Sequence, residues 1–197
     1  FMDWQHSICS SGGVAQYEVN QFLVRLVCEV GQDKKSEMFA ELDNFRQAIV
    51  WPKREPNYNG LKLEERVVMK PNKHVRMFAA ECMQTVMVLG LYSVLQLQPM
   101  GKLPEEVACL LLLGRILGIL RSGRRAVARL ALLKQLVLQH HDMFKRLYPG
   151  CAKIKPHLLF HIVDAIGYFQ VNLWCFSTER KHKSSKHIGA SPFAPGV

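Results

Sequence analysis

The stretch that decides the fold is KPHLLFHIVDAIGYFQVNLWCFSTERKHKSSK, residues 155–186. It places His157 and His161 four residues apart, then Glu179 and His182 three apart, with an almost entirely apolar run between the pairs. Residues spaced by three or four share one face of an α-helix. The stretch therefore predicts two helices, at roughly 156–168 and 177–188, each with a polar pair on one face.

The first pair, His157 and His161, has the spacing at which two imidazoles can reach one metal ion, and imidazole suits Zn²⁺. Two further ligands would have to come from elsewhere in the chain. The candidates are His140, His141, Asp142 and Cys151. The alternative interpretation is a pair of half-buried imidazoles with ordinary polar partners.

The second pair, Glu179 and His182, lies near the start of the last predicted helix, where Ser177 or Thr178 can cap it. A carboxylate beside the basic residues RKHK stays ionised and can hold a divalent cation. The alternative is a first-turn glutamate favoured by the helix dipole.

The rest of the chain predicts a mainly α fold. Apolar residues recur at helical spacing over residues 14–30, 36–50 and 72–97, and again from Pro104 to about Leu147 with an interruption at RSGRR. Turn residues separate these segments, among them Gly31, the stretch WPKREPNYNG and the tripeptide YPG. No stretch alternates with the period of two that a strand requires.

The charge of the chain favours an anionic partner. Lys and Arg outnumber Asp and Glu by 26 to 16, for a formal charge of +10. Nucleic acid is the first candidate and an acidic membrane surface the second, while basic residues spread over a solvated surface are the alternative. A contact with the phosphate backbone is expected from six residues: Arg121, Arg124, Arg125, Arg129, Lys181 and Lys183. Three of these arginines recur every four residues, on one side of a predicted helix, which is also the pattern of an ordinary solvated face.

Composition bounds the class of protein. A hydrophobic content of 49% indicates a folded globular chain. The longest apolar run, residues 107–120, contains Arg115 and is too short to span a bilayer. The six cysteines include no C-x-x-C pair and are expected to be reduced and mostly buried. We expect no signal peptide and no membrane partner.

Two further acids need an interpretation. Asp3 stands in MDWQH, three residues before His6 and ahead of SSGG, where an acidic residue can leave a strand and enter a loop. Glu81 lies among apolar residues of a predicted helix, so if buried it needs a polar partner. For Glu81 a structural role and a role in a site both remain open.

Taken together, DWQHSICSSGG and the 155–186 stretch resemble two segments of CACTA-type DNA transposases, which belong to the DDE group. The resemblance implies an RNase H-like core interrupted by an α-helical insertion between the second Asp and the final Glu. Residues 1–13 would be the end of a core strand and its loop, and 14–170 the insertion. Residues 171–188 would be the closing catalytic helix, and 189–197 a flexible tail.

The resemblance also implies roles for individual residues. Asp3 would be the second catalytic acid and Glu179 the third, whereas the first would lie upstream of Phe1, so that the N-terminal strands of the core are truncated. His157 and His161 would bind Zn²⁺ within the insertion, although the C-x-x-C pair that completes this site in related enzymes is absent here. His182 is a lesser candidate for a metal ligand.

This resemblance implies DNA cleavage and joining by two Mg²⁺ (or Mn²⁺) ions about 3.5–4 Å apart, held by carboxylates. DNA is then the expected partner, a homo-oligomer is allowed, and the location is nuclear for a eukaryotic transposase and intracellular otherwise. An element-derived copy without activity would keep the same pattern. Two alternatives stay open: a non-catalytic basic helical nucleic-acid-binding module, and a purely structural helical bundle.

Overall fold

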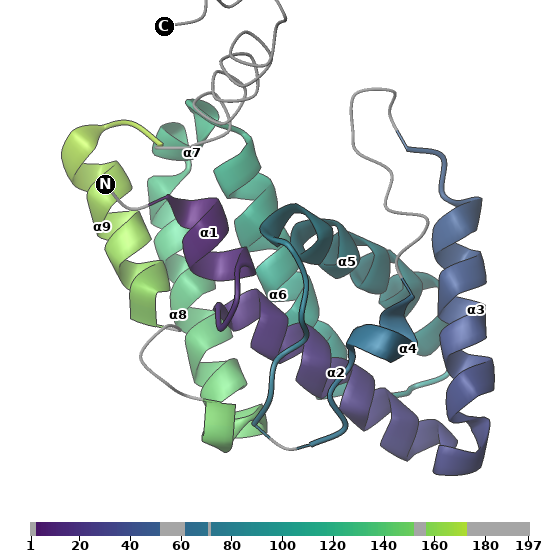
Figure 1. The fold of residues 1–197 in the computed structure, drawn as a ribbon. Coiled ribbons are helices and arrows are strands. Elements are labelled where there is room, and N and C mark those ends of the chain that lie inside the picture. The colour runs from purple at the N-terminus through teal and green to yellow at the C-terminus, as the bar shows by residue number, and fades with distance from the viewer. Residues whose placement is uncertain (1–2, 52–61, 71, 152–156, 173–197) are drawn as a thin grey trace, which may run out of the picture.

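The computed structural model describes residues 3–51, 62–70, 72–151 and 157–172 (Figure 1). These residues form helices joined by loops, and none of them lies in a β-strand. The mainly α prediction is confirmed. The helices are α1 (Trp4–Cys9), α2 (Val14–Val30), α3 (Lys35–Ala48), α4 (Leu63–Arg66), α5 (Ala79–Tyr92), α6 (Pro104–Arg121), α7 (Arg125–Ala128), α8 (Leu130–Leu147) and α9 (Leu158–Phe169).

Most helix boundaries follow local sequence signals. Helix α2 has the predicted bounds and ends at Gly31, whose φ of +98° few other residues adopt. Helix α6 begins at Pro104, as expected of a residue whose fixed φ suits the first turn. Helix α9 ends at Phe169, one residue beyond the predicted end.

The predicted helix over residues 72–97 is wrong at its N-terminal end, because α5 starts only at Ala79. The preceding residues run along α2 and bond to it. Val75 N donates to Gln16 O at 3.2 Å, and the buried Gln16 Nε2 donates to Met77 O at 2.6 Å. These bonds to another helix replace the ones that a helix would have made within the segment.

The N-terminal prediction also needs a correction. Residues 1–13 were expected to hold the end of a strand and a loop, yet Trp4–Cys9 form helix α1. Trp4, Ile8 and Cys9 are buried in the same apolar core as residues of α2 to α9. The segment thus packs as part of the helical body.

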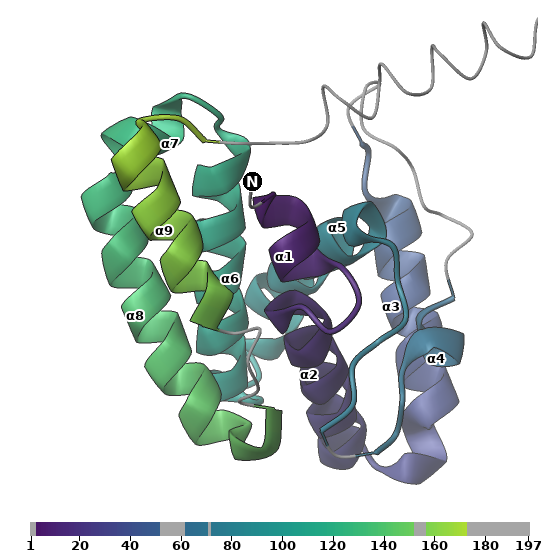
Figure 2. The ribbon, with the colours of Figure 1, turned by 60° about the vertical axis from the view of Figure 1, so that its left-hand side comes forward.

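The helices form two groups that meet at α6 (Figure 2). Helices α6, α8 and α9 stand side by side in one group, and α1, α2, α3, α4 and α5 make up the other. Helix α6 packs on α8 within its own group and on α5 and α2 in the other, while α1 packs on α9. Both groups therefore share one core.

Among the described residues, one segment, Ala79–Leu97, is long and apolar enough to cross a membrane by length and composition alone. However, 61% of its most apolar window is buried inside the protein. It lies against α6, α1 and α2, as the core helix of a globular domain does. Its burial accounts for its apolar composition.

Candidate functional site

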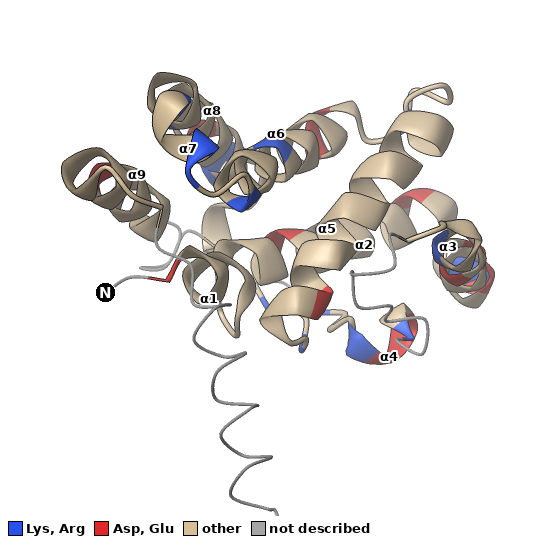
Figure 3. Ribbon diagram, turned by 90° about the horizontal axis from the view of Figure 1, so that it is seen from above, with Lys and Arg blue, Asp and Glu red and all other residues tan. Residues whose placement is uncertain are grey.

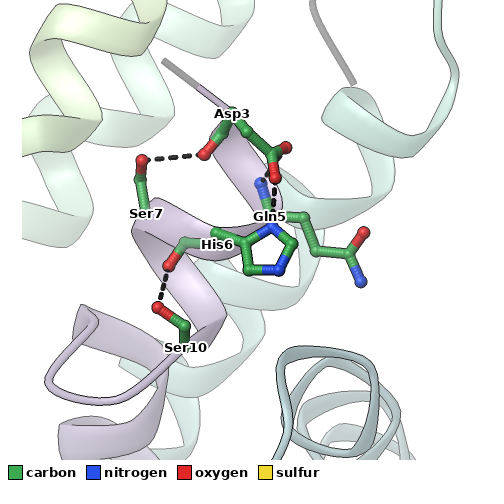
Figure 4. A network of polar contacts seen from close by, with 5 residues as sticks. All are labelled: Asp3, Gln5, His6, Ser7 and Ser10. Carbon is green, nitrogen blue, oxygen red and sulfur yellow. Dashed lines mark hydrogen bonds and ion pairs between the residues drawn. The ribbon is translucent and has the colours of Figure 1, made fainter. Parts of the chain in front are cut away.

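Asp3 caps helix α1 (Figure 4). Its carboxylate accepts a hydrogen bond from Gln5 N at 3.2 Å and also contacts the ring of His6 through Nδ1. The Ser7 hydroxyl donates to the Asp3 carbonyl oxygen at 2.7 Å. The spacing Asp-x-x-His thus corresponds to an N-cap and an i,i+3 pair on one turn of helix, with the carboxylate still partly exposed.

The N-terminal end of α1, which Asp3 caps, lies at the same end of the molecule as α7 and the C-terminal end of α9, and we call this the α7 end. Figures 1 and 2 show this arrangement. Asn172, just beyond α9, donates from Nδ2 to the carbonyl oxygen of Leu120 at 2.5 Å, close to the end of α6. The chain therefore enters and leaves the described helical body at the α7 end.

Four of the predicted nucleic-acid-binding residues lie in α7 or within four residues of it along the chain, and Figure 3 shows the basic part of α7 in blue. Arg124, Arg125 and Arg129 are exposed, whereas Arg121 is half-buried and its Nη1 approaches Met87 Sδ at 3.2 Å. The four belong to α6, α7 and the turns between α6, α7 and α8.

The prediction that Arg121, Arg125 and Arg129 follow one side of a continuous helix is wrong. Helix α6 ends at Arg121, and Gly123 has a φ of +62°, a left-handed conformation that ends helices. Arg129 falls in a second break between α7 and α8. The arginines gather at one end of the bundle instead of forming a stripe.

His157 and His161 are both exposed at the start of α9, with ring centroids 5.1 Å apart and the rings edge to face. His141, on α8, packs edge to face on Phe160. Burial, and then Lys145, lower the pKa of His141. Within the described residues, no group of three close metal-ligating atoms includes His157 or His161. Their role as zinc ligands stays a prediction.

The remaining predicted site residues, Glu179, His182, Lys181 and Lys183, lie outside the described residues. Glu81 is described and mostly buried, and its Oε2 accepts a hydrogen bond from Phe78 N at 2.8 Å. The expectation that a buried Glu81 has a partner is confirmed. This partner makes it a cap of helix α5.

The structure brings together a second group, Glu18 of α2, Cys109 of α6 and His140 of α8, of which the sequence analysis named only His140, as a candidate partner of His157 and His161. One ligand atom from each lies within 4.8 Å of the other two, and all three residues are buried. His140 Nε2 and Glu18 Oε2 are 2.6 Å apart. Three helices far apart in sequence thus converge on one polar centre inside the apolar core.

Some polar atoms of this centre do not make the hydrogen bonds of which they are capable. Glu18 Oε1 and His140 Nδ1 are buried and have no hydrogen-bond partner within the described part of the chain. Burial, and then the charge of Glu18, raise the pKa of the Cys109 thiol. An acid inside an apolar helical face is the signal that could have pointed to Glu18, since such an acid needs a buried partner. Nothing local identifies that partner as His140, 122 residues away.

Comparisons with known proteins add no identification: no family model, no curated protein and no solved structure matches this chain.

Proposed function

We propose that this chain is part of a transposase-like protein that cleaves and joins DNA by two-metal chemistry, with Asp3 and Glu179 as metal ligands. The observation that supports the proposal best is that α1, which Asp3 caps, begins at the α7 end, where α9 also ends. A helical domain inserted into a core has to begin and end close together, because both of its ends return to that core. The described helical body meets this requirement.

The distance along the chain allows the two acids to meet. Glu179 is the seventh residue after Asn172, and an extended chain spans at most about 3.6 Å per residue, so that Glu179 can lie up to about 25 Å from Asn172. Two carboxylates that share a pair of Mg²⁺ or Mn²⁺ ions bind them through oxygen, the ligand that these ions prefer. Asp3 keeps part of its carboxylate exposed, with a side-chain accessibility of 21%.

The basic residues at the α7 end fit a polyanionic substrate. Arg124, Arg125 and Arg129 are exposed there, and contacts of this kind with phosphates hold a protein on a duplex without reading its sequence. In this proposal His157 and His161 bind Zn²⁺ with ligands still to be identified, DNA is the partner, and a eukaryotic protein acts in the nucleus.

Binding of a luminescent hard cation tests the metal site directly. Tb³⁺ prefers oxygen ligands, and an indole close to it sensitises its emission, as Trp4 beside Asp3 can. We expect Mn²⁺ to displace Tb³⁺ from the wild-type chain, and Asp3→Asn or Glu179→Gln to weaken Tb³⁺ binding about tenfold or more, because each removes a charged ligand. Asp164→Asn, at an exposed position of α9, is the control and should change nothing. If Glu179→Gln and Asp164→Asn bind Tb³⁺ with equal affinity, Glu179 is not a ligand of this site.

The same arginines favour a second candidate, a basic helical nucleic-acid-binding module without catalysis. For both candidates, the double variant Arg125→Ala/Arg129→Ala should lower the slope of log K against log salt by about 1.8 if each arginine contacts one phosphate of a duplex. Fluorescence anisotropy with a labelled duplex measures this slope. Lys145→Ala is the control. Lys145 is exposed and lies about 24 Å along α8 from Arg129, at 1.5 Å per residue.

The two candidates differ at the acids. The module predicts that Glu179→Gln leaves DNA binding unchanged or stronger and that Tb³⁺ finds no common site for Asp3 and Glu179. The transposase-like protein predicts loss of that cation site. If the arginine variants do not change the slope of log K against log salt and no cation site is found, both candidates are wrong. The purely structural bundle is then the remaining interpretation.

A further inference from the structure

We propose that Glu18, Cys109 and His140 form a structural Zn²⁺ site that holds α2, α6 and α8 together. This inference goes beyond the proposed function, since none of the three residues belongs to the acidic site or to the predicted pair His157 and His161. It rests on the arrangement of ligand atoms, on their burial and on the polar atoms that lack a partner.

The three side chains supply one oxygen, one sulfur and one nitrogen, the ligand types that Zn²⁺ takes in proteins. Tetrahedral bonds of about 2.0–2.3 Å put two ligand atoms of one zinc ion about 3.3–3.6 Å apart. The atoms here lie within 4.8 Å of one another, and the His140 Nε2–Glu18 Oε2 pair is at 2.6 Å. Side-chain rotations that shift these atoms by about 1 Å produce the tetrahedral spacing.

Tyr148 is our candidate for the fourth ligand. Tyr148, which follows α8, is buried and its hydroxyl has no hydrogen-bond partner within the described residues. Burial raises the pKa of this hydroxyl, and the charges of Glu18 and Cys109 raise it further. The Tyr148 hydroxyl or a water bound to it would complete the four positions that a structural zinc ion requires.

The charges of the proposed ligands favour a divalent cation. A carboxylate and a thiolate together carry two negative charges, which Zn²⁺ balances, so that the buried centre stays neutral overall. The ion would also give the unpaired Glu18 Oε1 a partner. All three ligands are closed off from solvent, which is typical of zinc sites that stabilise a fold and not of those that bind a substrate.

The alternative is a hydrogen-bonded Glu18–His140 pair that binds no metal. It explains the contact between Nε2 and Oε2 and a hydrogen bond of the Cys109 thiol to Glu18, but it leaves Glu18 Oε1 without a partner among the described residues. Buried polar groups without partners are uncommon in folded proteins, and an unpaired carboxylate oxygen beside a thiol and an imidazole favours a ligand.

Co²⁺ substitution tests the site, because a thiolate bound to Co²⁺ gives a charge-transfer band in the near ultraviolet. We expect the full chain, stripped of metal and kept reduced, to develop this band with one equivalent of Co²⁺ and to lose it when Zn²⁺ is added. Cys109→Ser should abolish the band. Cys28→Ser, at an exposed cysteine of α2, and the double variant His157→Ala/His161→Ala should both keep it.

X-ray absorption of the wild-type zinc protein gives a second result that does not depend on a variant that has to fold. We expect one sulfur and otherwise nitrogen or oxygen neighbours around the zinc ion. No band in the wild type, a band that survives in Cys109→Ser, or a zinc ion without exactly one sulfur neighbour would overturn the proposal. None of these outcomes affects the Tb³⁺ test at Asp3, so the two proposals fail separately.

Discussion

Two carboxylate–histidine pairs in this protein are built from the same chemistry in opposite surroundings. Asp3 and His6 are three residues apart on one turn of helix, with side-chain accessibilities of 21% and 50%. Glu18 and His140 are 122 residues apart and almost completely buried. A pair that solvent reaches is worth little to stability, whereas a buried pair constrains the fold, because neither member can be left alone in the core.

The largest expected effect is at the buried pair. Glu18→Ala leaves His140 without its partner inside the core, and we expect it to lower the free energy of unfolding by about 3–5 kcal/mol. Urea unfolding followed by circular dichroism measures the change. Glu29→Ala, at an exposed position of the same helix, is the matched control. A loss below about 1 kcal/mol would mean that the buried pair does not constrain the fold.

A smaller effect is expected at the exposed pair. Asp3→Ala removes the side-chain cap of α1 and should lower the free energy of unfolding by about 1 kcal/mol. Asp3→Asn should be nearly neutral, because Asn caps a helix about as well as Asp. The same Asn variant is expected to lose Tb³⁺ binding. One substitution thus distinguishes the role of Asp3 in stability from its role in metal binding. A large loss of stability in Asp3→Asn would show that the carboxylate serves the fold.

A still smaller effect is expected at a pair that is more than half exposed on both sides. Arg146 Nη2 and Glu105 Oε1 are 2.8 Å apart, and both side chains are more than half exposed. Glu105→Gln should change the free energy of unfolding by less than about 0.5 kcal/mol, since solvent and salt screen such pairs. The measurement is again urea unfolding, at low and at high salt. A loss comparable to that of Glu18→Ala would abolish the contrast between buried and exposed pairs.

At neutral pH the smallest effect is expected from His141, the neighbour of His140. Burial and Lys145 lower its pKa from 6.5, with smaller lowering by His140 and His157 and an opposing effect of Asp142. Below pH 6.5 the unfolded chain binds this proton more readily than the folded one, so the contribution of His141 to stability is present above pH 6.5 and declines as pH falls through the lowered pKa. His141→Gln should therefore flatten the dependence of the melting temperature on pH below 6.5. Parallel curves for the two proteins would contradict this.

Local signals in the sequence were sufficient for most of the fold. The apolar period over residues 14–30, the glycine at 31 and the proline at 104 each act within a few residues, so they could be read without knowing the rest of the chain. The start of α5 could not be read in this way. It depends on Gln16 of helix α2, which forms hydrogen bonds with two backbone groups of the segment before Ala79.

Some residues of the candidate sites could be recognised from local spacing in the sequence, and others only from the packing of the helices. Asp3 and the pair His157 and His161 stand out in the sequence because their partners are three or four residues away. The helix that carries His157 and His161 was expected from that spacing, whereas the residues around Asp3 were expected to be strand and loop and form helix α1. Glu18, Cys109 and His140 have no common pattern in the sequence. Only the packing of α2 against α6 and of α6 against α8 puts them within reach of one another.

The sequence by itself determined a basic, mainly helical protein, the bounds of α2 and the start of α6. Tertiary structure alone decided that the arginines gather at one end with Asp3 and the end of α9, and that an acid, a thiol and an imidazole meet in the core. The physical reason is the range of the interactions. Helical periodicity and capping act over a few residues, whereas burial forces polar groups from distant helices to satisfy one another.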